Sequence, residues 1–292
     1  MKRYKILTAA AMTLFITWSS ISVQAREAIQ NIYPPGYVQT DNGVMWMQED
    51  GTWAVNRWLY VGDKTYHVDE NGYIQSGLTS INGKVYYLYQ EGTIARSWTL
   101  INGNWYYFNF DGSMAVNTLV DGLFLGNDGK IISTGDQIPP QKTELRQIVD
   151  MILTSIIKPE MTEEEMIAAC YWYMVNNHTY NRTYDKPSGD WTGTYALEIL
   201  SSGQGNCFRF AAGYAYLLNA LGYETKVITG EIGTRKGGMT PHGWTEVKID
   251  GNWYVFDTEL QYANGKKNYY WKTYETYPSK PIVKQQEWPV SF

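Results

Sequence analysis

One cysteine in the chain stands where proteins most readily activate a thiol. The run Gly203-Gln-Gly-Asn-Cys207 comes just before an apolar stretch that predicts a helix over 207–221, ending at Gly222. We therefore expect Cys207 in the first helical turn, with Asn206 as the N-cap. Unpaired backbone N–H groups and the positive end of the helix dipole favour a thiolate there. The sequence thus predicts a nucleophile at Cys207.

A base and an orienting carboxylate follow this cysteine. His242 stands just before a predicted strand over 243–249, and Asp257 ends the following strand. The turn Asp250-Gly251 joins the two strands as a hairpin, so their outer ends should be neighbours. The carboxylate would then hold one ring nitrogen while the other faces the sulfur. We interpret the three residues as a catalytic triad.

The other cysteine and histidines have structural interpretations. Cys170 fits the buried face of a predicted helix and is interpreted as a packing residue. A disulfide between Cys170 and Cys207 remains an alternative for a secreted protein. His178 is interpreted as a polar loop residue, and His67 replaces a tyrosine of a repeat.

Other chemistries have weaker support in the sequence. A glycosidase would need a pair of carboxylates, and Asp185, Asp190 and Glu198 show no convincing arrangement for one. No group of histidines and cysteines has metal-ligand spacing, and the Asp-Gly turns lack further oxygen ligands for calcium. We expect neither a metal nor another cofactor.

The elements that would hold the triad form a C-terminal α+β domain, predicted over 143–292. Apolar spacing predicts a helix over 144–157, and Thr162 with Glu165 forms a capping-box signature for a second helix reaching Val175. Strands follow near 225–229, 243–249 and 253–256. A stretch over 133–142, with paired prolines, is predicted to be a linker.

The N-terminal half differs from the C-terminal half because it consists of internal repeats. From Gly43 to about Ile132, turn glycines recur with a period near twenty residues. Asn82-Gly83 and Asn102-Gly103 are hairpin turns between short strands rich in aromatic and β-branched residues. Because a lone hairpin cannot bury a core, we expect an all-β solenoid of stacked hairpins over 26–132.

The first 25 residues read as a secretory signal peptide, with cleavage predicted after Ala25. An uncleaved anchor is the alternative, but the apolar run is shorter than the roughly 20 residues that span a bilayer. Cleavage would take the formal net charge from -5 to -8, because it removes three basic residues and no acid. We expect a secreted protein that binds neither nucleic acid nor, after cleavage, a membrane.

Three motifs of the C-terminal half resemble the transglutaminase-like superfamily. They are GNCFRFA from Gly205 with LLNALGYETKV from Leu217, HGWTEV from His242 and NWYVFDT from Asn252. The resemblance implies a papain-like Cys-His-Asp enzyme that forms a thioester on peptide or glutamine amide bonds. Its oxyanion would be met by the Cys207 N–H, and a contribution from Gln204 stays open. Glu259 departs from the pattern, since the family often has proline and threonine after the aspartate.

The N-terminal repeats resemble the cell-wall-binding repeats of Gram-positive surface proteins, of the choline-binding and glucan-binding kind. In the choline-binding members, aromatic rings from adjacent hairpins cage a quaternary ammonium. The resemblance places such rings at Trp58, Tyr66, Tyr86, Trp98, Trp105 and Tyr106. The match is incomplete, because Leu78 and Thr118 stand where Trp98 has its equivalents. The alternative is that the rings only fill the solenoid core.

Together these features favour a cell-surface cysteine enzyme, either a peptidase, a deamidase or a crosslinking acyltransferase. Its expected partners are a cell-wall polymer, carbohydrate or teichoic acid, and a protein or peptide substrate. The alternative is a binding or scaffolding protein whose transglutaminase-like half has lost activity.

Overall fold

A computed structural model describes residues 36–132, 143–183, 187, 189, 191–234 and 236–292. The predicted signal peptide, 1–25, and linker, 133–142, lie outside these residues. The described residues group into two compact units. One holds those up to Thr79 together with Leu88–Ile94, and the other holds Ser80–Tyr87 and Ala95–Phe292.

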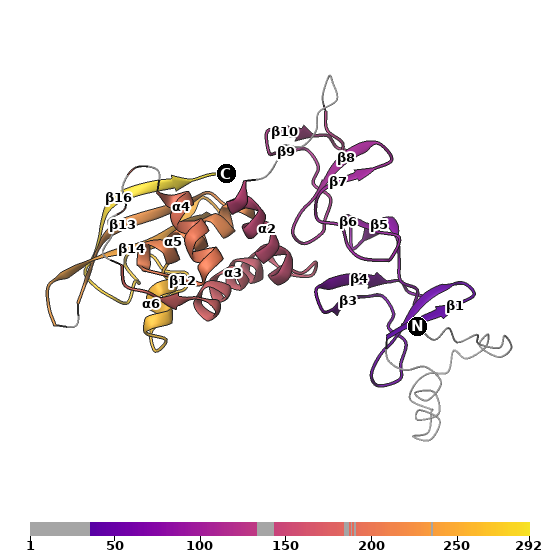
Figure 1. Ribbon diagram of the computed structural model, residues 1–292, viewed down its shortest axis with the longest axis horizontal. Helices are drawn as coiled ribbons and strands as arrows, with labels where there is room; N and C mark the ends of the chain where they lie inside the picture. The colour runs from indigo at the N-terminus through magenta and orange to yellow at the C-terminus, as the bar shows by residue number, and fades with distance from the viewer. Residues whose placement is uncertain (1–35, 133–142, 184–186, 188, 190, 235) are drawn as a thin grey trace. The chain divides into compact units, whose positions relative to one another are not determined.

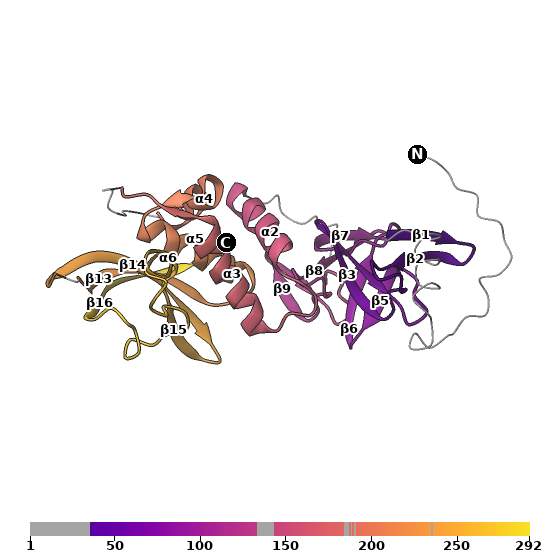
Figure 2. The same ribbon diagram turned by 90° about the horizontal axis from the view of Figure 1, so that it is seen from below.

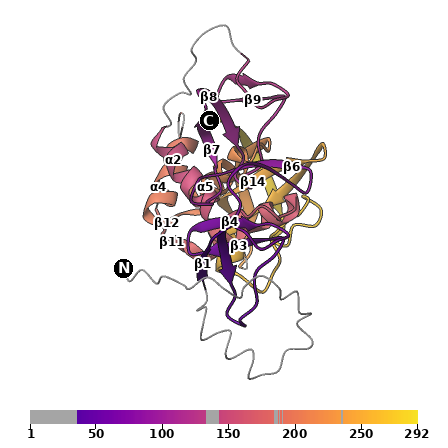
Figure 3. The ribbon, with the colours of Figure 1, turned by 90° about the vertical axis from the view of Figure 1, so that its right-hand side faces the viewer.

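The repeats fold as two-stranded antiparallel hairpins, as the sequence predicted (Figures 1 and 3). The paired strands are β1 (Gly36–Thr40) with β2 (Gly43–Met47), β3 (Arg57–Val61) with β4 (Lys64–Val68), β5 (Gly77–Ile81) with β6 (Lys84–Leu88), β7 (Ser97–Ile101) with β8 (Asn104–Phe108), and β9 (Thr118–Val120) with β10 (Leu123–Leu125).

Local turn chemistry explains the hairpins and their spacing. Asn102 and Gly103 have φ of 49° and 78°, the left-handed pair that matches the twist of the flanking strands. Beyond its own hairpin, a strand also bonds to a segment further along the repeats. In the first unit the Ile94 N–H donates to the Thr65 carbonyl at 2.9 Å. Each hairpin thus gains neighbours that it could not supply alone.

The C-terminal region is an antiparallel sheet with helices packed against it (Figures 1 and 2). Its strands are β13 (Thr225–Gly233), β14 (Met239–Ile249), β15 (Asn252–Phe256) and β16 (Ile282–Val290), in the order β15-β14-β13-β16. The helices are α2 (Glu144–Ile156), α3 (Glu163–Asn177), α4 (Thr192–Ser202), α5 (Cys207–Ala220) and α6 (Thr258–Ala263). The short β11 (Thr179–Tyr180) pairs in parallel with β12 (Gln204–Gly205).

Helix α5 packs on β13 and β14 and occupies the middle of the core. Phe210 and Leu217 on α5 have no exposed surface, and neither have Val247 on β14 and Phe256 on β15. The fully buried α3 residue Tyr171 makes ring contacts with Phe256. Apolar burial on this scale fixes the position of the α5 start relative to the sheet.

The predicted α+β class is confirmed, and the helix boundaries fall within one or two residues of the predictions. Other details differ. His242 lies inside β14, which begins four residues earlier than expected, and α4, α6, β16 and the short β11 and β12 were not predicted. In the described part of the chain, no helix is both long and apolar enough to cross a bilayer.

Candidate active site

Cys207 is the first residue of α5, and the chain before it is held tightly. The Asn206 side chain caps the helix by accepting from the Arg209 N–H at 3.2 Å. A Cβ atom on Gly205 would lie 2.6 Å from the Cβ of Arg209, so only glycine fits there. Asn206 is buried and Cys207 is 8% exposed. The thiol therefore sits among helix-start N–H groups with a narrow opening to solvent.

Strand β14 lies directly against this helix start. A Cβ on Gly243 would lie 2.7 Å from the ring of Phe208 and 3.2 Å from its Cα. Two residues further on, the Thr245 hydroxyl donates to the Ala211 carbonyl at 2.9 Å. Glycine at 243 thus permits the close approach that brings His242 to the start of α5.

Asp257 holds the imidazole from the other side. Its Oδ2 accepts from the His242 Nε2 at 2.7 Å, and both side chains are almost fully buried. Oδ1 accepts from the Leu260 N–H at 2.8 Å, because Asp257 is the N-cap of α6. The Tyr277 hydroxyl also donates to Oδ2. Three donors therefore fix this carboxylate in one orientation.

The His242 ring is poised to exchange a proton with sulfur. Burial alone would lower the pKa of His242. The charge of Asp257 and its hydrogen bond have the opposite effect, and so do the hydrogen bond and charge of Cys207. Together these contacts outweigh burial and raise the pKa of His242 well above 6.5. Because Asp257 occupies Nε2, Nδ1 is the nitrogen left for Cys207. The structure thus brings the three predicted residues together in an order that suits nucleophilic catalysis.

Two residues near the imidazole were missed in the sequence. Tyr277 is 1% exposed, and burial followed by the Asp257 charge raises its pKa far above 10, so it stays a neutral donor. It lies in an irregular segment twenty residues after Asp257, where no pattern signals its role. Glu259 was noted only as a departure from the family pattern. Its Oε2 lies 3.9 Å from the His242 Nδ1.

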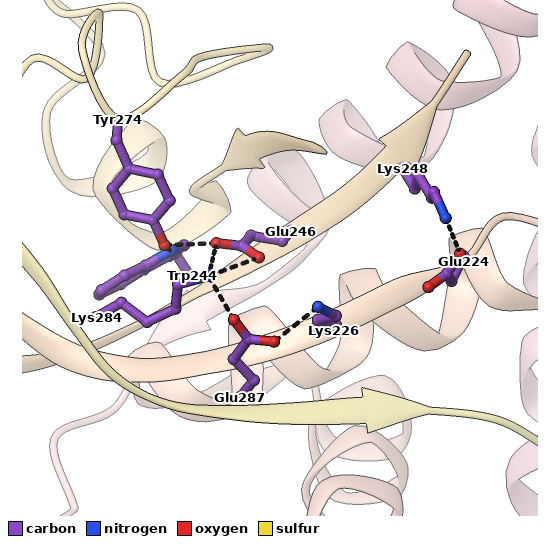
Figure 4. A network of polar contacts seen from close by, with 8 residues as sticks. All are labelled: Glu224, Lys226, Trp244, Glu246, Lys248, Tyr274, Lys284 and Glu287. Carbon is purple, nitrogen blue, oxygen red and sulfur yellow. Dashed lines mark hydrogen bonds and ion pairs between the residues drawn. The ribbon is translucent and has the colours of Figure 1, made fainter. Parts of the chain in front are cut away.

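A partly buried series of polar contacts supports Trp244, whose ring stacks beside His242 (Figure 4). The rings of His242 and Trp244 have centroids 6.3 Å apart at 26°. The Trp244 Nε1 donates to the Tyr274 hydroxyl at 3.1 Å, and that hydroxyl donates to Glu246 at 2.5 Å. Lys284 on β16 pairs with Glu246 at 2.9 Å. Trp244 is therefore held by polar contacts as well as by packing.

The remaining candidates lie apart from this chemistry. Both cysteines are free thiols, so no disulfide joins them, and burial raises the pKa of the Cys170 thiol. His178, interpreted as a polar loop residue, is the C-cap that follows α3 and is buried, and its Nδ1 contacts the Met174 carbonyl at 3.1 Å. Glu198 pairs with Arg209 at 2.7 Å.

Four further residues were named in the sequence analysis. Asp185 and Asp190 lie outside the described residues. The rings of His67 and Trp58 meet edge to face in the first unit. Gln204 is exposed in β12.

His242, Asp257 and Glu259 are the acid and imidazole groups that gather most closely in the described chain. One ligand-type atom from each lies within 4.8 Å of the others. However, His242 and Asp257 bond to each other, and Leu260 and Tyr277 take further lone pairs of the carboxylate. A metal would have to displace these hydrogen bonds, so the donor set suits proton transfer better than ligation.

The six repeat rings that the resemblance singled out lie on hairpin strands. Tyr66, Tyr86, Tyr106 and Trp58 are buried, whereas Trp98 and Trp105 are partly exposed. The structure pairs Trp58 with His67, Tyr66 with Tyr37 and Trp98 with Tyr107, with centroids 4.8, 5.5 and 5.3 Å apart. Trp98 also donates to Asp121 at 2.8 Å.

Comparison with known families identifies both halves. Residues 150–258 match the transglutaminase-like superfamily, and this range holds Cys207, His242 and Asp257 but stops one residue before Glu259. Residues 75–119 match the choline-binding repeat, and residues 56–74 match the putative cell wall binding repeat. The protein therefore carries a transglutaminase-like core domain and choline-binding cell wall repeats, which indicate attachment at the cell-wall surface.

Similar solved structures include choline binding protein F from Streptococcus pneumoniae, which is 28% identical over 34% of this chain and 34% of that chain, with a TM-score of 0.33. A choline binding domain from a second Streptococcus pneumoniae protein is 30% identical over 27% of this chain and 96% of that chain, with a TM-score of 0.26. The Cpl-1 endolysin, solved with a peptidoglycan analogue, is 21% identical over 37% and 39% of the two chains, with a TM-score of 0.27. The chain thus spans about a third of choline binding protein F. No curated protein matches it.

Proposed function

We propose that the protein is a cell-wall-attached cysteine acyltransferase or peptidase that acts on peptide or glutamine amide bonds. The observation that carries this proposal is the hydrogen-bonded series from Asp257 through His242 to Cys207. Superfamily membership of residues 150–258 supports the same chemistry. The choline-binding repeats would keep the enzyme close to substrates at the wall, with choline-bearing teichoic acid as their ligand.

In the proposed reaction, Nδ1 of His242 takes the Cys207 proton while the sulfur attacks the amide carbon. The Cys207 N–H at the start of α5 meets the developing oxyanion. The C–N bond then breaks, the imidazolium returns its proton to the departing amine, and a thioester remains. Water as the acceptor releases an acid, whereas a primary amine forms a new amide. Both routes restore the Cys207 thiol.

Alkylation separates an active enzyme from an inactive scaffold without knowledge of the substrate. We expect iodoacetamide to label Cys207 much faster than Cys170, because only Cys207 has a base beside it. The variant His242→Ala should slow labelling of Cys207 about 100-fold, because a single general base typically accelerates a reaction by at least this factor. Peptide mass analysis after timed labelling measures both cysteines in one sample. Equal, slow labelling of the two thiols would favour the scaffold.

The reaction type is read from the masses of the products. Full-length protein is incubated with a glutamine-containing peptide and a labelled primary amine. We expect one of three results: amine incorporation, ammonia loss without incorporation, or chain cleavage. Cys207→Ala is the matched control and should abolish whichever product appears. A product that persists in Cys207→Ala would contradict the proposal, as would the absence of all three across a set of wall peptides and proteins.

Attachment is tested separately from catalysis. The full chain should bind choline-bearing cell walls and be released by free choline, and Cys207→Ala should bind equally well. If free choline does not release the bound protein, the repeats bind a different wall polymer.

A further inference from the structure

A second carboxyl group lies beside the imidazole, on the side that faces the thiol. Glu259 is in the first turn of α6, two residues after Asp257, and is 8% exposed. Its Oε2 lies 3.9 Å from Nδ1 of His242, whereas Asp257 contacts Nε2 at 2.7 Å. The ring is thus flanked by two carboxyl groups, one at each nitrogen.

The two carboxyl groups are placed for different tasks. Asp257 is held by a backbone N–H, a tyrosine hydroxyl and the imidazole, so its position is fixed. At 3.9 Å, Glu259 lies beyond hydrogen-bond distance of Nδ1 but within ion-pair distance. It therefore leaves the Nδ1 proton free for sulfur while its charge acts on the ring.

Ionisable groups from several elements of the described chain lie around α6. His242 and Asp257 supply the charges that act on Glu259, and Glu259 in turn raises the pKa of Tyr277. Helices α3 and α5 and strand β11 pack against α6. Among the described residues, these elements carry Cys207 at the start of α5, Tyr171 on α3, whose hydroxyl donates to the Asp257 carbonyl, and the exposed Tyr180 on β11.

We propose that Glu259 is a positioning residue that stabilises His242 as an imidazolium from the thiol side and thereby strengthens the Cys207–His242 ion pair when it is ionised. This inference rests on the proposed function, because a role for Glu259 in catalysis requires that Cys207 and His242 be the catalytic pair. It goes beyond the triad, because Glu259 is a fourth group at the imidazole and lies outside the family match. Burial, partly offset by His242, raises the pKa of Glu259 to about 7, so its charge changes near neutral pH.

The test follows Cys207 alkylation by iodoacetamide from about pH 5.5 to about 8.5, around the pKa of Glu259. In this reaction the sulfur proton moves to Nδ1, the S–C bond forms and iodide leaves. We expect the wild-type rate to show an extra rise near pH 7 that Glu259→Gln lacks. Above that pH the variant should react about tenfold more slowly than the wild type, because loss of one nearby charge shifts the pKa of the imidazole by about one unit.

Two further variants separate charge from shape. Glu259→Asp keeps the charge on a shorter side chain and should retain the rise near pH 7 with a smaller amplitude. Glu224→Gln removes an exposed carboxylate that pairs with Lys248, and should match the wild type throughout. If Glu259→Gln gives the wild-type profile, or if Glu259→Asp gives the profile of Glu259→Gln, the role assigned to Glu259 is wrong.

Thermal unfolding shows whether Glu259 has only a structural effect. A carboxyl with a raised pKa keeps its proton in the folded state after the unfolded chain has lost it, so the fold loses stability as pH rises from about 4.5 to about 7. Glu259→Gln should avoid this loss and melt higher than the wild type at pH 8 but not at pH 4. A difference in melting without a changed alkylation profile would reduce Glu259 to a structural residue and overturn the proposal.

The experiment also distinguishes this inference from the proposed function. If His242→Ala leaves labelling of Cys207 unchanged, the catalytic pair itself is absent and the proposed function fails. If His242→Ala slows labelling while Glu259→Gln does not alter its pH profile, the function stands and only the role of Glu259 falls.

Discussion

Replacing Asp257 with asparagine is expected to lower turnover about 10⁴-fold, the effect of the wrong histidine tautomer in a triad. The Leu260 N–H fixes an oxygen at the Oδ1 position, which leaves the new amide NH₂ facing His242. Nε2 must then accept instead of donate, so the ring proton moves to Nδ1. Nδ1 can no longer take the proton of Cys207. Steady-state rates with the active substrate, and iodoacetamide labelling in parallel, measure the loss.

Tyr277→Phe is the matched control for this substitution. It removes one donor to Asp257 but leaves the carboxylate and the tautomer intact. We expect it to slow turnover about tenfold, the scale of one hydrogen bond to a charged group. Melting temperatures of both variants show whether the fold is retained. An Asp257→Asn enzyme that keeps more than a tenth of wild-type turnover would contradict the assigned role.

The second large effect concerns stability. Trp244→Ala is expected to destabilise the C-terminal region by about 3–5 kcal/mol, because a fully buried indole leaves a cavity. The change also removes the ring stacked on His242 and the N–H that bonds to Tyr274. Since small domains have a total stability of about 5–15 kcal/mol, this loss is a large share. Denaturant unfolding followed by far-ultraviolet circular dichroism measures it, because the helices of the described chain lie in this region.

Trp172→Ala is the control that removes an exposed tryptophan instead of a buried one. Trp172 lies on α3 and is 44% exposed, so we expect its loss to cost less than about 1 kcal/mol. Trp244→Phe keeps an aromatic ring but loses the bond to Tyr274, and should fall between the two alanine variants. Equal unfolding midpoints for Trp244→Ala and the wild type would mean that this ring does not support the site.

Local signals in the sequence predicted much of this architecture. Asn-Gly pairs set the hairpin turns, since both residues there adopt positive φ. Thr162 with Glu165 forms the predicted capping box, and Asn206 caps α5 as expected. These features depend on a few adjacent residues, so a single sequence reveals them.

Other elements depend on contacts that the sequence does not display. The N-cap of helix α4 is Trp191, whose side chain makes no capping hydrogen bond, so the sequence carries no N-cap signal there. Strand β16 is an exposed edge strand with polar residues on both faces, and its alternation is weak. Tyr277 and Glu259 reach the imidazole only after the chain has folded around α6. Tertiary packing alone explains their positions.

The order of strands in the C-terminal sheet has a consequence for biosynthesis. Strand β13 stands between β14 and β16, and β16 follows β14, β15 and α6 along the chain. A ribosome must therefore synthesise all of these elements before β13 can pair with its second neighbour. Cys207 is translated before every strand of this sheet, so a nascent chain carries the thiol before the sheet that positions His242 and Asp257 is complete.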